Sequence, residues 1–173
     1  MLRPLIIALL VFGSLFGLVD CNSGSNCGSG KFCECGGGDQ CFIGCDGDNC
    51  SQSCHDMNRC GTVCGNGCTS DCHSVGTECS QACGDHCFLT CENLPTCGVL
   101  CGNDCTLKCD SVTKCAAEVG AGSNVTCTNL SSCVVHCTGA CTVNCLNNGC
   151  DVSCADSSAA AECSPGVFKC GGC

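Results

Sequence analysis

The feature that most constrains this chain is a run of cysteines that repeats about every 18 residues. Each unit reads Cys-x3-Cys-x3-Cys-x3-Cys, and such units begin at Cys60, Cys79, Cys97 and Cys133, with a slightly stretched copy beginning at Cys41. A fixed period of this length is typical of a stacked repeat, in which each unit buries its inner face only against its neighbours. The sequence therefore predicts a repeat array over residues 41–154.

Inside each unit the pattern is that of a strand. In residues 97–101 and 141–145, cysteine, an aliphatic residue and cysteine occupy alternate positions, which predicts a strand with one buried face. The spacing of four also fits a helix face, but the Gly-Asn sequences of residues 65–67 and 102–104 favour tight turns between the strands. We expect an all-β fold, a small disulfide-filled β-solenoid with coils of about 18 residues and irregular caps.

The composition indicates that disulfides, rather than large apolar side chains, stabilise the interior. Cysteine accounts for 31 of 173 residues, while the chain has six Phe and no Trp or Tyr. A core of large side chains is therefore unavailable, and cross-links must replace it. Disulfides at this density persist in an oxidising compartment.

The N-terminal segment is typical of a secretory signal peptide. Arg3 precedes an apolar run over residues 5–12, and the apolar character continues to Val19. The alternative is a transmembrane anchor, which is disfavoured because the run is short and interrupted by Gly and Ser. We therefore expect a signal peptide over residues 1–20, followed by a polar tether and N-terminal cap over 21–40. Residues 155–173 break the repeat and are expected to form a linker and C-terminal cap.

The sequence Leu18-Val19-Asp20-Cys21, followed by Asn-Ser-Gly-Ser-Asn, resembles a bacterial lipoprotein signal, although Asp20 stands where that family has a small residue. The resemblance implies that Cys21 is acylated and tethers the chain to a membrane. The cysteine count supports acylation of Cys21, because the other 30 of the 31 cysteines are an even number and can all pair in disulfides. The alternatives for an odd cysteine are a free thiol and an intermolecular bridge.

The predicted architecture resembles the disulfide-filled β-solenoids known among insect antifreeze proteins. Their repeat is shorter and carries a regular row of threonines. Here the outward positions beside the strand cysteines are mixed, so an ice-binding face is not expected: Thr69, Phe88, Thr106, Asn124 and Thr142.

A defective unit suggests the disulfide pairing. After Cys115 the two inner cysteines are replaced by Val119 and Ser123, whereas the outer position returns at Cys127. We infer that inner cysteines pair with inner and outer with outer, although pairing between adjacent coils stays open. The predicted inner pairs are Cys64–Cys68, Cys83–Cys87, Cys101–Cys105 and Cys137–Cys141, and the predicted outer pairs are Cys60–Cys72, Cys79–Cys91, Cys97–Cys109, Cys115–Cys127 and Cys133–Cys145.

Two kinds of metal site are alternatives to a purely structural role for this chain. A thiolate site is disfavoured because Cys-x2-Cys occurs only at Cys170–Cys173 and because secretion oxidises thiols. A surface site is an alternative, since the residue after each fourth cysteine would stack into one column whose side chains bind divalent ions. That column is His55, His73, Glu92 and Asp110.

The net charge of −10 disfavours nucleic acid and anionic membranes as partners. No nucleophile elbow or other catalytic motif is present in the sequence, so we do not expect an enzyme or a cofactor. The predicted function is a secreted or lipid-tethered structural protein of the cell surface or envelope, with surface or matrix contacts, and the alternative is a metal-binding protein.

Overall fold

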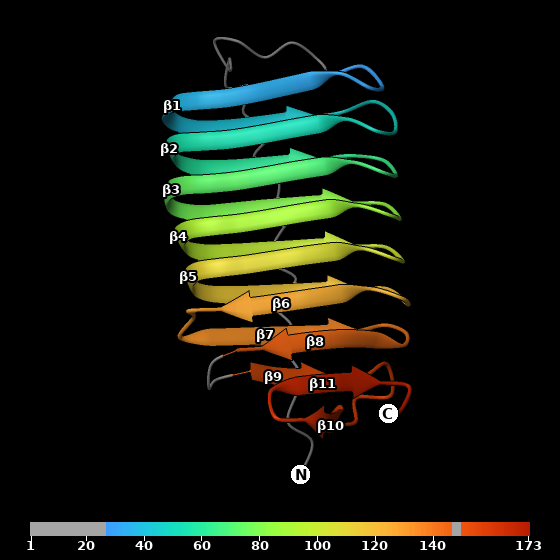
Figure 1. Ribbon diagram of the computed structural model, residues 1–173. Coiled ribbons are helices and arrows are strands. Elements are labelled where there is room, and N and C mark those ends of the chain that lie inside the picture. The colour runs from blue at the N-terminus through green and yellow to red at the C-terminus, as the bar shows by residue number, and fades with distance from the viewer. Residues whose placement is uncertain (1–26, 147–149) are drawn as a thin grey trace.

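The computed structural model describes residues 27–146 and 150–173, and its fold is the predicted cysteine-rich β-solenoid. About seven coils of roughly 18 residues stack along one axis (Figure 1). The described residues form no helix, and so contain none that could span a membrane. The strands are β1 (Phe32–Gly44), β2 (Ser51–Val63), β3 (Thr69–Cys83), β4 (Phe88–Cys101), β5 (Thr106–Val119), β6 (Asn124–Thr128), β7 (Ser132–Cys137), β8 (Cys141–Cys145), β9 (Cys150–Ser153), β10 (Ala161–Ser164) and β11 (Val167–Cys170).

Each of the strands β1 to β5 contributes to both sides of one flattened coil. The strand runs along a first side, passes round a corner and returns along a second side, as Figure 1 shows. Each pairs in parallel with the next, and β6, β8 and β7, β9 continue the first and second sides, respectively. The parallel register places equivalent residues of successive coils in columns that run along the solenoid axis.

The corner of each coil depends on one residue in a left-handed conformation. Asp56, Ser74, Asn93, Ser111 and Asn129 have φ between 52° and 56°, a region that Asn and Asp tolerate better than most residues because their short polar side chains bond locally. The residue that follows turns inward, and its side chain is buried after the first four of these residues: Met57, Val75, Leu94 and Val112.

The opposite end of each coil is a tight turn that is held by a ladder of Asn and Asp side chains. The Oδ1 atoms of Asp48, Asn66, Asp85 and Asn103 each accept a hydrogen bond from a backbone N–H one coil later, at 2.6 to 2.9 Å. A Cβ on Gly102 would overlap the Asp85 side chain. The Gly-Asn and Gly-Asp pairs are therefore needed for close stacking of the turns as well as for chain reversal.

The interior contains sulfur and aliphatic side chains together with a few buried polar residues, of which the two glutamines are the largest. Leu89, Leu107 and Val125 fill one inward column, where each is at most 2% exposed. Nearer the N-terminus, Gln52 lies in this column and Gln81 lies in the column of Val99, and both glutamines are also buried. Buried amides require partners, and each side chain donates from its Nε2 to a backbone carbonyl oxygen, at 3.0 Å (Gln52 to Val63) and 3.2 Å (Gln81 to Thr90).

Fifteen disulfides join all 30 cysteines between residues 27 and 173. The four predicted inner pairs are present, and they close the tight turns. Their Cα atoms are 6.0 to 6.5 Å apart, which is within the normal range for disulfides. They are Cys64–Cys68, Cys83–Cys87, Cys101–Cys105 and Cys137–Cys141.

The predicted outer pairs are wrong. Cys60–Cys72, Cys79–Cys91, Cys97–Cys109, Cys115–Cys127 and Cys133–Cys145 do not form, because the segment expected to be a third side is a short corner. The corner brings the cysteines on its two flanks within 6.3 to 6.5 Å of each other, measured between Cα atoms. The pairs that form are Cys54–Cys60, Cys72–Cys79, Cys91–Cys97, Cys109–Cys115 and Cys127–Cys133, and Cys145 pairs with Cys150.

The ends of the array differ from the expected boundaries. The first coil begins at Phe32 rather than at residue 41, because Cys35 is in register with Cys54 of the next coil. At the other end β10 and β11 form an antiparallel hairpin, and β11 pairs antiparallel with β8. This hairpin covers an edge of the last coil, as a capping segment should. Residues 1–20 and Cys21 lie outside the described residues.

Candidate functional site: a histidine and carboxylate column

The structure places the four predicted metal ligands in one column. His55, His73, Glu92 and Asp110 occupy equivalent positions in β2, β3, β4 and β5, and each is the backbone partner of the next. All four follow a cysteine whose disulfide closes the corner, at the point where the strand leaves the first side of the coil. The column itself therefore follows from the repeat register.

The two histidines of the column are stacked. Their ring centroids are 5.3 Å apart, and the ring planes differ by 11°. The N-terminal neighbour of His55 in the column is Gly36, and a Cβ there would overlap the His55 ring. The absence of a side chain at Gly36 therefore lets the His55 ring lie over the first coil.

The histidines contact carboxylates that the sequence analysis did not select. His55 Nε2 lies 2.8 Å from Glu34 Oε1, and His55 Nδ1 lies 3.1 Å from Asp56 Oδ2. His73 Nδ1 lies 2.7 Å from Asp71 Oδ2. Glu34 and Asp71 share the adjacent outward column, with Ser53 between them. Side chains two residues apart lie on the same face of a strand, so the sequence Asp71-Cys72-His73 was the signal for one of these contacts.

The carboxylates raise the pKa of His55 above its ordinary value of 6.5. The hydrogen bond to Asp56 is the main cause and that to Glu34 is the second, because both carboxylates stabilise the protonated ring. The side chain of His55 is 25% exposed, so water weakens these interactions but does not remove them.

The other half of the predicted column has different partners. Lys108 Nζ lies 3.4 Å from Asp110 Oδ2, and the Nδ2 group of Asn129 donates to Asp110 Oδ1 at 3.1 Å. Burial raises the pKa of Asp110, but the hydrogen bonds from Asn129 and Lys108 outweigh it and leave the pKa below its ordinary value. The four predicted residues thus do not form one group: the histidines contact Glu34, Asp56 and Asp71, whereas Asp110 contacts Lys108 and Asn129. Glu92 lies between His73 and Asp110 in the column.

The cysteine sulfurs come together in threes, as in Cys54, Cys60 and Cys72. Two of these three are bonded to each other, and Cys72 is bonded to Cys79. A sulfur in a disulfide is not a thiolate, and thiolates are the form that binds zinc or copper. The disulfide pairing therefore makes a thiolate metal site less favourable.

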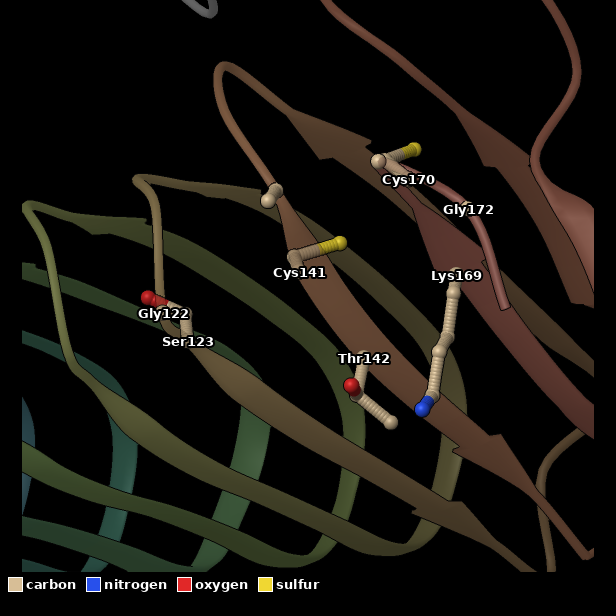
Figure 2. A pocket seen from close by; sticks show the side chains of 9 residues that line it. Gly122, Ser123, Cys141, Thr142, Lys169, Cys170 and Gly172 are labelled. Atoms are coloured by element: carbon tan, nitrogen blue, oxygen red, sulfur yellow. The ribbon is translucent and has the colours of Figure 1, made fainter.

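A shallow hollow of about 210 Å³ lies beside the C-terminal cap (Figure 2). Its lining includes Thr142 of β8 and Lys169 of β11, which are backbone partners. The two cysteines in the lining, Cys141 and Cys170, are held in disulfides. Among the residues that line this hollow, Lys169 is the one charged side chain, and none pairs a nucleophile with a base.

Comparison of the chain with protein-family models, with curated proteins and with solved structures found no match.

Proposed function

We propose that the protein is a non-enzymatic, disulfide-stabilised extracellular scaffold, which is secreted or tethered to a membrane surface through an acylated Cys21. One observation carries this proposal. Every cysteine between residues 27 and 173 is in a disulfide, and such extensive bonding persists in an oxidising, extracellular environment.

The disulfides clamp the coils locally. Apart from the two bonds of the C-terminal cap, each one joins cysteines only 4 to 7 residues apart. Most coils thus carry one bond at the corner and one at the tight turn, and these bonds hold the two sides of the coil together. Proteases cleave segments that open locally, so bonds at both ends of a coil favour resistance to digestion.

The surface supports a role in presentation rather than in chemistry. Acidic side chains recur at the tight turns, as in Asp48, Asp85 and Asp104, and the side chain of Asp104 is 56% exposed. Together with the shallow hollow at the cap, this pattern favours a rigid element that presents a repeated acidic and polar face to surface or matrix partners. Net negative charge also favours solubility.

The proposal is tested by the redox state and the location of the protein. Chain expressed with its own N-terminal segment would be collected with thiol-trapping alkylation, and its intact mass would be compared with and without reduction. We expect reduction to add two hydrogens for each of the fifteen disulfides, and we expect the protein in the medium or on intact cells, where added antibody reaches it. Several trapped thiols in natively collected protein, or protein that stays inside the cell, would overturn the proposal.

Digestion provides a second readout. Oxidised protein should survive trypsin added to intact cells, whereas reduced and alkylated protein should be cleaved after its lysines and Arg59. Equal digestion of both forms would contradict the role of the disulfides in this rigidity.

A further inference from the structure

Four side chains of the first three coils lie where the first side of the solenoid meets the corner. They come from three successive coils: Glu34 from β1, His55 from β2, and Asp71 and His73 from β3. His55 and Glu34 meet at 2.8 Å, and His73 and Asp71 meet at 2.7 Å. Since the histidine rings are stacked at 5.3 Å, the two imidazole–carboxylate pairs are neighbours.

This set of donors matches the preference of a divalent transition-metal ion. Imidazole nitrogen and carboxylate oxygen both bind Zn²⁺ at about 2.0–2.2 Å, commonly with four ligands. Two histidines and two carboxylates supply two nitrogen and two oxygen donors. Asp56, at 3.1 Å from the other nitrogen of His55, is placed to orient that ring, as carboxylates commonly do for metal-bound histidines.

We propose that Glu34, His55, Asp71 and His73 bind a divalent transition-metal ion such as Zn²⁺. One ion binds the unprotonated imidazole nitrogen of each pair together with the carboxylate oxygen beside it; a proton on that nitrogen passes to water where the ring is doubly protonated, and to the other ring nitrogen where the ring is neutral. The two rings must tilt toward each other to reach one ion, and their exposure of 25% and 41% leaves room for this movement. The site goes beyond the proposed scaffold function and does not depend on it.

The ligand set differs from the column of equivalent positions. Glu92 and Asp110 continue that column, but Asp110 contacts Lys108 and Asn129, and a cation beside Lys108 is unfavourable. Glu34 and Asp71 of the neighbouring column already contact the imidazole rings, and they are the proposed ligands in place of Glu92 and Asp110.

The test is titration of the oxidised, alkylated full chain with ZnCl₂ by isothermal calorimetry, after treatment with EDTA and in a non-chelating buffer. Alkylation removes any free thiol as a competing ligand. We expect one Zn²⁺ per chain, and we expect the dissociation constant to rise by about tenfold or more in His55→Gln and in His73→Gln. Glu34→Gln, at a side chain that is 54% exposed, gives a third variant with little risk to folding.

His86→Asn is the matched control. His86 is also exposed and also lies near a carboxylate, Asp104, at 3.7 Å, but it lies in a tight turn, and Asn49 already adopts the same positive φ in this chain. We expect this variant to bind Zn²⁺ as the parent does. The proposal is overturned if Zn²⁺ shows no saturable binding, or if variants at the four residues that keep the parent disulfide pattern bind as tightly as the parent.

Cobalt gives an independent spectroscopic readout. Co²⁺ bound by nitrogen and oxygen should show visible d–d bands without a thiolate charge-transfer band, and Zn²⁺ should abolish those bands. A thiolate band, or d–d bands that persist in His73→Gln, would place the ion elsewhere and overturn the assignment.

Discussion

One turn disulfide can be replaced by the two residues that occupy the same positions in another coil, and we expect this replacement to lower the free energy of unfolding only slightly. The coil that lacks an inner disulfide has Val119 and Ser123 in its place, and Val119 is fully buried. Ser123 Oγ accepts from the N–H of Cys105 at 3.1 Å and donates to the carbonyl of Gly102 at 3.3 Å. The perturbation is therefore the double substitution Cys101→Val with Cys105→Ser.

The magnitude follows from the short loop and the new hydrogen bond. Cys101 and Cys105 are separated by 4 residues, and for such a loop the chain-entropy treatment gives about 2 kcal/mol. Cys105 Sγ already lies 3.5 Å from the carbonyl of Gly84, so a serine there can donate to it and recover about 1 kcal/mol. We expect a net decrease in the free energy of unfolding of about 1–2 kcal/mol.

The assay is guanidinium unfolding without reductant, followed by circular dichroism. The control is the double substitution to alanine at the same two positions, which also loses the valine side chain and the hydrogen bond and should cost about 1–3 kcal/mol more than the valine and serine pair. The reasoning is refuted if the two double variants are equally stable, or if the valine and serine variant fails to fold.

Four further outcomes are expected. Val119→Cys with Ser123→Cys should form an additional disulfide, seen as a loss of two hydrogens by mass, and should raise the free energy of unfolding by about 2 kcal/mol; two trapped thiols would contradict this. Gly102→Ala should lower the unfolding midpoint more than Gly98→Ala, because only at Gly102 would a Cβ overlap the turn beneath; equal midpoints would argue against the stacked turns. Leu107→Ala should cost about 2–5 kcal/mol because the side chain is 1% exposed, and a smaller loss in the unfolding curve would mean that the core collapses around the gap. In metal-free protein, NMR titration should give His55 a pKa above 6.5, and Asp56→Asn should lower that pKa. A raised histidine pKa stabilises the fold fully below about pH 6.5, and this stabilisation is lost as the pH rises through the pKa of the folded protein. A His55 pKa of 6.5 in the folded protein would mean that His55 makes no such contribution to stability.

The strands, turns and columns were predictable because they depend on local chemistry. Alternation over residues 97–101 predicts a strand and Gly102-Asn103 predicts a turn, so the turn that Cys101–Cys105 closes followed from one unit, whereas the pairing was inferred from the coil that lacks both inner cysteines. The absence of both inner cysteines at positions 119 and 123 was informative, since these two positions face each other across one turn.

The corner was not predictable in this way. The sequence pattern of residues 92–96 gives one inward aliphatic, Leu94, which fits a third side as well as a corner, and the choice depends on the left-handed conformation of Asn93. That conformation brings Cys91 next to Cys97, whereas a third side would have separated them. Glu34 was missed because its contact with His55 depends on the first coil, whose spacing of Cys33 and Cys35 hides its register with the others.

The most direct test of the central claim is a disulfide map, made by peptide mapping of natively collected protein at acid pH, where exchange is slow. The claim that each coil is closed by its own local bonds predicts Cys91 linked to Cys97 and Cys101 linked to Cys105, with no free thiol between residues 27 and 173. A Cys79–Cys91 or Cys97–Cys109 link, or free thiols in the coils, would contradict it.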